Sequence, residues 1–130
     1  MLNLAVFALL APAFLACKKE KSFKDELVGH WISIQVTAAG TDVTDAYRYD
    51  LKLESNQEFN LDLTTIVPLT GEIVKSYSGD WSEDEAKRDI TLFYSDGAEK
   101  TWEVVSLETN ALTAEIVENN IRYQVKFERN

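Results

Sequence analysis

The chain has 130 residues, of which 45% are hydrophobic and 27% are charged, enough for one domain with a modest core. Twenty-two acidic and 13 basic residues give a formal net charge of −9, which argues against binding to nucleic acid because phosphates would repel the protein. The single cysteine excludes an intramolecular disulfide, and the single histidine argues against a multi-histidine metal site. Five glycines and two prolines are too few for a fibrous or disordered chain.

The first sixteen residues carry no charged side chain, and Asn3 is the only polar one among them. A run of this length is short for a membrane-spanning helix, which needs about 20 apolar residues, but it suits the hydrophobic region of a secretory signal. The run ends at Cys17, and charged residues occupy 18–21. The segment Phe14-Leu15-Ala16-Cys17 resembles the bacterial lipobox, in which small residues precede a cysteine that becomes the lipidated N-terminus. The alternative is an uncleaved N-terminal anchor or a buried helix.

The lipobox resemblance implies a signal peptide at 1–16, a lipidated tether at 17–22 and a membrane anchor of diacylglycerol and palmitate chains on Cys17. Two or three acyl chains hold a protein stably on a bilayer where one does not. We therefore expect a lipoprotein in the cell envelope of a Gram-negative bacterium. Lys18 follows the cysteine where an aspartate is associated with inner-membrane retention, which favours the outer membrane. The usual basic residues at the start of such a signal are missing, which is explained most simply by a start codon upstream of Met1.

After the tether, Ser22 is placed to cap one helical turn at Phe23–Val28, and Gly29 is placed to end it. Apolar and polar residues then alternate with a period of two, which predicts strands with one dry and one wet face. The alternation is clearest at the C-terminal end of the chain, where Ile121, Tyr123 and every second residue after them are apolar up to Phe127. Eight strands are predicted in this way, at His30–Thr37, Tyr47–Glu54, Phe59–Thr64, Ile73–Trp81, Asp89–Tyr94, Glu99–Leu107, Leu112–Val117 and Ile121–Arg129.

Eight consecutive strands joined mostly by short turns predict an all-β, up-and-down antiparallel meander. A meander with one apolar face either closes into a barrel or stacks as a β-sandwich. We predict the eight-stranded barrel, because closure removes the two exposed edges that regular strands would otherwise present. The sandwich is the alternative.

The segment Leu27-Val28-Gly29-His30-Trp31 opens the first strand after a short helix, and it is similar to the Gly-x-Trp signature of the lipocalin superfamily. Together with the lipobox, it makes the chain resemble small bacterial lipoproteins with a lipocalin-like domain, here covering 23–130. In that family a late arginine stacks on the signature tryptophan, which implies a structural group of Gly29, Trp31 and Arg129. A solvated terminal arginine is the alternative. The second and third lipocalin motifs are not recognisable.

The meander places its connections alternately at two ends. The end opposite Trp31 receives the two longest predicted loops, 38–46 and 65–72, and long loops usually mark the working end of a barrel. Aromatic walls with hydroxyl tips suit an amphipathic small molecule. The predicted ligand-binding residues, all inward by strand parity near that end, are Tyr47, Tyr49, Tyr94, Trp102 and Tyr123. The alternative is that these side chains simply fill a small barrel.

Two functions follow from these patterns. The first is a membrane-anchored carrier or sensor that holds a small amphipathic or hydrophobic ligand in the barrel. The second is a filled barrel that acts as an interaction or inhibitor module in the envelope, where a charge of −9 would attract a basic protein partner. We predict no enzyme, no cofactor and no metal site. His30 is expected to be structural, and no phosphate-binding glycine loop or calcium-loop spacing is present in the sequence.

Overall fold

The computed structural model describes residues 21–130, so the predicted signal peptide, Cys17 and most of the tether lie outside the described residues. The described part begins with a short helix, α2 (Phe23–Leu27), as expected. The Ser22 side chain accepts a hydrogen bond from the Asp25 amide at 3.1 Å, which is the predicted N-cap. The helix ends one residue earlier than predicted, and Gly29 is the first residue of a strand rather than a C-terminal cap. Within 21–130, no helix has the length and apolar character needed to cross a bilayer.

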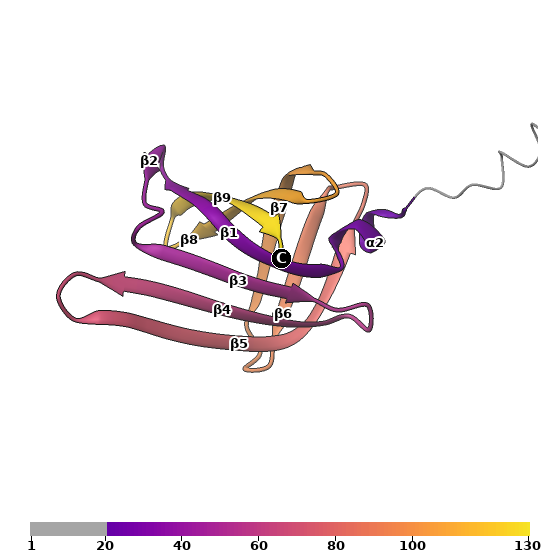
Figure 1. Cartoon of the computed structure of the whole chain (residues 1–130). Coiled ribbons are helices and arrows are strands. Elements are labelled where there is room, and N and C mark those ends of the chain that lie inside the picture. The colour runs from indigo at the N-terminus through magenta and orange to yellow at the C-terminus, as the bar shows by residue number, and fades with distance from the viewer. Residues whose placement is uncertain (1–20) are drawn as a thin grey trace, which may run out of the picture.

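Nine strands follow α2, and each one pairs antiparallel with its neighbours (Figure 1). β2 has two residues and pairs only with the end of β1, whereas the other eight strands form a continuous meander. β1 also pairs with β9, which closes the sheet into a barrel. The predicted eight-stranded barrel is therefore confirmed, and the β-sandwich alternative is wrong. The strands are β1 (Gly29–Ala38), β2 (Thr41–Asp42), β3 (Tyr47–Leu53), β4 (Glu58–Val67), β5 (Gly71–Asp84), β6 (Asp89–Tyr94), β7 (Glu99–Leu107), β8 (Ala111–Glu118) and β9 (Ile121–Arg129).

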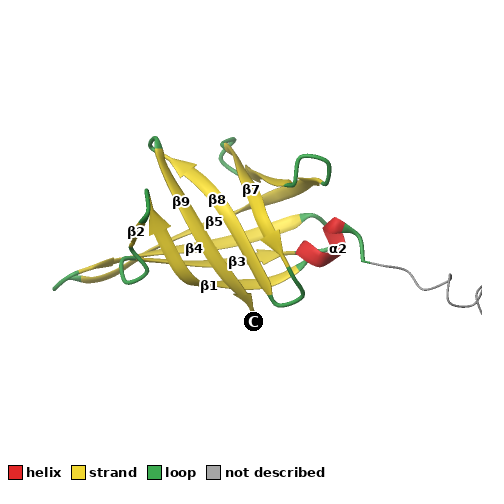
Figure 2. Cartoon of the chain, turned by 90° about the horizontal axis from the view of Figure 1, so that it is seen from above, coloured by secondary structure: helices red, strands yellow, loops and turns green. Residues whose placement is uncertain are grey.

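The largest departure from the predicted elements is the hairpin of β4 and β5. The sequence predicts a loop at 65–72, but both strands continue through most of it and pair as far as Val67 opposite Gly71. This part of the hairpin projects beyond the rest of the barrel, away from α2 (Figures 1 and 2). Ile73 and Val74 are both exposed there, so neither face is dry and no apolar–polar alternation develops. The β-branched residues of 64–67 favour strand all the same.

The core lies inside the barrel and consists mainly of inward strand residues. Three tryptophans, Phe59, Phe127 and several leucines are almost completely buried. Bulges in β1 and β7 shift the parity, between Ser33 and Gln35 and between Val104 and Ser106. A bulge adds one unpaired residue, so the next inward position moves by one. For this reason Val36 faces the core, while Ile34 is exposed.

The two ends of the barrel differ. α2 covers one end, where Phe23 and Leu27 are buried against the core (Figures 1 and 2). The Arg88 guanidinium carbon lies 4.5 Å from the Phe23 ring centroid at the same end. We call this the closed end. The opposite end, where β3 begins and β8 turns into β9, is called the open end.

Candidate functional site

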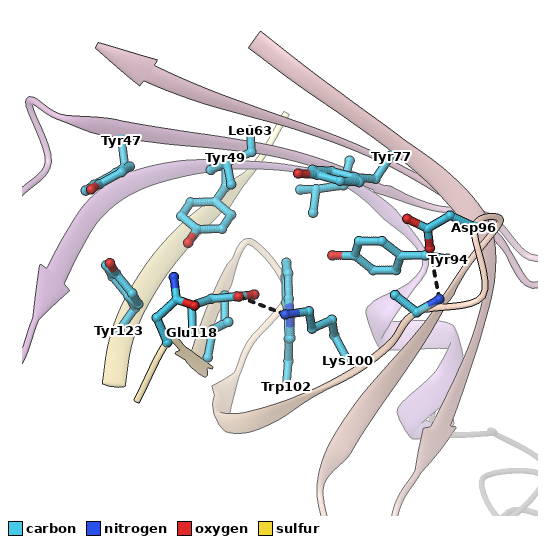
Figure 3. Close-up of a pocket in the computed structure, with 14 residues that line it drawn as sticks. Tyr47, Tyr49, Leu63, Tyr77, Tyr94, Asp96, Lys100, Trp102, Glu118 and Tyr123 are labelled. Carbon is cyan, nitrogen blue, oxygen red and sulfur yellow. Dashed lines mark hydrogen bonds and ion pairs between the residues drawn. The ribbon is translucent and has the colours of Figure 1, made fainter. Parts of the chain in front are cut away.

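A cavity of about 400 Å³ lies toward the open end of the barrel (Figure 3). The structure places all five predicted ligand-binding residues in its lining. That these residues bind a ligand stays a prediction. The lining consists of Tyr47, Tyr49, Leu61, Leu63, Tyr77, Tyr94, Asp96, Ala98, Lys100, Trp102, Ile116, Glu118, Asn119 and Tyr123.

The five predicted residues lie at different depths. Tyr49 and Trp102 are 5% and 1% exposed, so they lie deeper than the half-buried Tyr47, Tyr94 and Tyr123. Tyr49 meets Trp102 edge to face, with ring centroids 6.1 Å apart, and the Trp102 ring stacks on Phe127. These contacts fix the deep aromatic wall, because such pairs stabilise each other beyond their buried area.

Two further aromatic pairs stand on opposite sides of the cavity (Figure 3). Tyr47 and Tyr123 form an edge-to-face pair with centroids 5.9 Å apart. Tyr77 and Tyr94 are tilted, with centroids 5.0 Å apart. The cavity is therefore bounded on two sides by pairs of phenol rings that pack against one another.

Lys100 and Glu118 form an ion pair in the lining that the sequence analysis missed. The Lys100 Nζ atom lies 2.8 Å from Glu118 Oε2, and the pair sits between the two groups of tyrosines (Figure 3). The strand predicted at Leu112–Val117 stops one residue before Glu118, whereas β8 includes that residue. Parity would have found both residues, because Lys100 is two positions before the inward Trp102 and Glu118 two positions after the inward Ile116.

Tyr77 was also missed, although it lies four residues before the inward Trp81 on β5 and so shares its parity. Gly79 stands between the two, and the space that a Cβ would occupy there is taken by the Phe93 carbonyl of β6. This close approach of β6 to β5 ends near Tyr94, where the loop 95–98 begins. That loop supplies Asp96 and Ala98 to the cavity.

Burial, aided by nearby negative charge, raises the pKa of three phenols of the cavity. Burial raises the pKa of Tyr94 to about 12, and the negative charges of Glu118 and Asp96 act in the same direction. Burial, followed by Glu118, also raises the pKa of Tyr49. The pKa of Tyr123 is raised by the same two causes and by the neighbouring Tyr47. At neutral pH these three hydroxyls are therefore uncharged groups that can donate hydrogen bonds.

The three tryptophan N–H groups have different surroundings. At the closed end, the Trp31 indole donates to the Leu27 carbonyl at 2.8 Å, and the Trp81 indole donates to the Glu54 carbonyl at 2.9 Å. The Trp102 indole N–H is buried and has no acceptor among residues 21–130. A buried N–H group without an acceptor lowers the stability of the fold, so Trp102 differs from the other two tryptophans, whose N–H groups are hydrogen-bonded.

The structural group implied by the lipocalin resemblance lies at the closed end. Trp31 is opposite Arg129 in the β1–β9 pairing, and the guanidinium carbon lies 4.2 Å from the indole centroid. The Arg129 guanidinium also donates to the carbonyls of Glu26, Val28 and Thr109 at 2.7–2.8 Å. It occupies the space that a Cβ of Gly29 would need, which is why glycine stands there. The arginine is thus a packed cation rather than a solvated terminal side chain.

His30 lies on the outer face of the barrel beside the same strand pairing. Its Nε2 is 2.6 Å from Asp50 Oδ1, and its Nδ1 is 3.1 Å from the Asn130 side-chain nitrogen. The first contact links β1 to β3 and the second links β1 to the residue that follows β9, so both hold neighbouring segments together. Within the described residues, no group of three or more histidine, cysteine, aspartate or glutamate side chains is arranged to hold a metal ion.

No protein-family model and no curated protein sequence matches the chain. Solved structures do match it. The bovine lipocalin allergen Bos d 2 gives a TM-score of 0.54 at 11% identity, covering 84% of this chain and 76% of the allergen. Bovine odorant-binding protein in complex with a selenium-containing odorant gives a TM-score of 0.53 at 10% identity, and the match covers 87% of this chain and 76% of the odorant-binding protein. A de novo designed fluorescence-activating β-barrel gives a TM-score of 0.53 at 11% identity, and the match covers 85% of this chain and 100% of the designed chain. The chain therefore has the closed, eight-stranded antiparallel barrel fold that lipocalins share.

Proposed function

We propose that the barrel binds one small amphipathic or hydrophobic molecule in the cavity at its open end. The observation that carries this proposal is the cavity of about 400 Å³, with five tyrosines, one tryptophan and one ion pair in its lining. Ligand sites are typically concave, mostly apolar and roughly 300–1,000 Å³ in volume, with a few directed polar groups. A barrel filled by its own side chains would leave no such space, so the cavity favours the carrier or sensor over the filled interaction module.

The similar structures support this proposal at the level of the fold. Bovine odorant-binding protein holds an odorant, and the designed barrel is described as fluorescence-activating. Both share the barrel architecture with this chain at low sequence identity, so they indicate what such a barrel can accommodate. The chemical class of the ligand must therefore be inferred from the residues that line the cavity of this chain.

The direct test is to block the cavity without removing core side chains. Ala98 is exposed, lines the cavity and contributes only its backbone to the surrounding hydrogen bonds. Ala98→Trp should therefore keep the fold and abolish binding of a neutral fluorescent hydrophobe such as N-phenyl-1-naphthylamine. The matched control is Ala111→Trp, an exposed alanine at the start of β8 outside the lining. Absence of binding by the wild-type protein, or equal binding by both variants, would contradict the proposal.

We further propose that the barrel is tethered to a membrane of the bacterial envelope, preferably the outer membrane, through lipid chains on Cys17. The support is the apolar run of the first sixteen residues and the lipobox-like segment that ends it. In cells fed labelled palmitate, the wild-type protein should incorporate the label and sediment with membranes. Cys17→Ser should lose the label and the membrane association. Labelling of the serine variant at the wild-type level would overturn this assignment.

A further inference from the structure

We propose that the cavity selects organic cations, that is, amphipathic molecules whose polar end is an ammonium group. This inference rests on the proposed function and specifies the class of its ligand. It is carried by the charges and ring faces that line one cavity. Anionic amphiphiles, such as fatty-acid carboxylates, are the class that it disfavours.

The first argument is the balance of charge in the lining. Three ionisable side chains with full charges at neutral pH face the cavity, namely Asp96, Lys100 and Glu118, and they sum to −1. The single cation is already engaged, because the Lys100 Nζ atom lies 2.8 Å from Glu118 Oε2. Asp96 Oδ1 accepts a hydrogen bond from the uncharged Ala98 amide at 2.9 Å, and no cationic side chain among residues 21–130 pairs with it.

The second argument is the reach of this negative charge into the cavity. Glu118 contributes to the raised pKa of Tyr49, Tyr94 and Tyr123, and Asp96 adds to the effect at Tyr94, although burial is the larger cause for each phenol. These phenols come from three different strands around the cavity. Burial disfavours a charge of either sign, but the negative charge of Glu118 acts specifically against the carboxylate of a ligand and favours an ammonium group.

The third argument is the aromatic lining. Tyr47 and Tyr123 stand on one side of the Lys100–Glu118 pair, and Tyr77 and Tyr94 stand on the other (Figure 3). The rings of each pair are inclined to one another, by 79° and 47° respectively, so they present faces in more than one direction. Ring faces attract cations, and cages of several aromatic rings recognise quaternary ammonium groups.

A cationic ligand and an anionic ligand would affect the Lys100–Glu118 ion pair differently. A ligand ammonium group would give Glu118 a second positive neighbour and leave the Lys100 contact in place. A ligand carboxylate that reached Lys100 would share its ammonium group with Glu118 and would add a third negative charge to a cavity that already holds Glu118 and Asp96. Like charges that share a site disfavour ionisation. The cation is therefore the better occupant.

The test compares three probes that share one alkyl chain: octyltrimethylammonium, octanol and octanoate. Isothermal titration calorimetry with the purified protein at low salt should give the lowest Kd for the ammonium probe, at least about tenfold below that of octanoate. Equal or tighter binding of octanoate would overturn the inference while leaving the proposed function intact. Binding of none of the three, and of no neutral hydrophobe, would overturn both.

Variants identify the group responsible. Glu118→Gln removes the carboxylate and frees Lys100, so it should weaken the ammonium probe by about tenfold and strengthen octanoate. The matched control is Glu115→Gln on the outer face of the same strand, where the carboxylate also pairs with a cation, Arg122, at 2.7 Å. The control should bind all three probes like the wild-type protein. An unchanged preference in Glu118→Gln, with its thermal unfolding intact, would overturn the inference.

Discussion

The closed and open ends of the barrel are built from similar residues but use them differently. At the closed end, Trp31 donates its indole N–H to a carbonyl, and Arg129 stacks on the ring and donates to three more carbonyls. At the open end, Trp102 is equally buried, but its N–H has no acceptor among residues 21–130, and the cation Lys100 bonds to a half-exposed carboxylate. At the closed end the polar groups of Trp31 and Arg129 are hydrogen-bonded within the protein. The open end has a cavity and an indole N–H without an acceptor among residues 21–130.

This difference indicates that stability and binding are located apart in the chain. Groups that satisfy one another completely hold strands together but have nothing to offer a ligand. Groups with free ring faces, protonated hydroxyls and a partly exposed ion pair contribute less to the fold and more to recognition. Substitutions at the closed end should therefore change mainly the free energy of unfolding, whereas substitutions of the partly exposed ion pair at the open end should change mainly affinity.

The largest expected effect is that of Trp31→Ala. The side chain is fully buried and packs between α2, β3 and β9, so its removal leaves a cavity in addition to the lost burial. We expect a loss of about 3–5 kcal/mol in the free energy of unfolding, measured by urea denaturation. A loss below about 1 kcal/mol would show that the closed end does not anchor the barrel.

Arg129→Ala should have the next largest effect. The substitution removes a cation–π contact and three hydrogen bonds to carbonyls, and it detaches α2 from the last strand. We expect a loss of about 2–3 kcal/mol. Arg129→Lys keeps the charge but lacks the planar guanidinium that donates to three carbonyls, so it should recover less than half of the lost free energy of unfolding. Full rescue by lysine would indicate that charge alone matters at this position.

Alkaline pH should destabilise the open end before the closed end. An unfolded tyrosine has a pKa near 10, whereas the pKa of Tyr94 in the fold is about 12, raised first by burial and then by Glu118. Because the folded state disfavours the phenolate, the stabilisation is complete below pH 10 and is lost as the pH rises from 10 to about 12. The melting temperature should fall across this window, and less steeply in Tyr94→Phe. Equal slopes for the variant and the wild-type protein would contradict this assignment.

The smallest effect on stability is expected for the ion pair at the open end. Both side chains are more than a third exposed, so solvent screens their attraction. Lys100→Met should cost less than about 1 kcal/mol in urea denaturation while changing the affinity for charged probes. A loss as large as that of Arg129→Ala would show that the two ends do not differ in the way described.

The alternation of apolar and polar residues was sufficient to predict most strands. β6, β7 and β9 have the predicted bounds, and Arg129 lies opposite Trp31, as the lipocalin resemblance implied. The projecting part of the β4–β5 hairpin could not be predicted in this way. Both faces of this part of the hairpin are in contact with solvent, as the exposed Ile73 and Val74 show. A strand that is exposed on both faces does not need alternating apolar and polar residues, so its sequence lacks that pattern.

The candidate site was predicted only in part, for reasons of register. Parity was sufficient to predict five of the six aromatic residues that line the cavity, and Tyr77, which has the same inward parity, was missed. The Lys100–Glu118 pair depends on the register of β7 and β8, in which Glu103 lies opposite Glu115, so that Lys100 comes level with Glu118. A bulge at Val105 shifts this register, and no local pattern in the sequence reports it.

The most direct test of the central claim uses the indole N–H signals of the three tryptophans in ¹⁵N–¹H correlation spectra. Trp102 lines the cavity, whereas Trp31 and Trp81 are hydrogen-bonded at the closed end. Titration with octyltrimethylammonium should shift the Trp102 signal in proportion to saturation and leave the other two in place. A shift of all three signals together, or of the Trp31 and Trp81 signals alone, would contradict a ligand site at the open end.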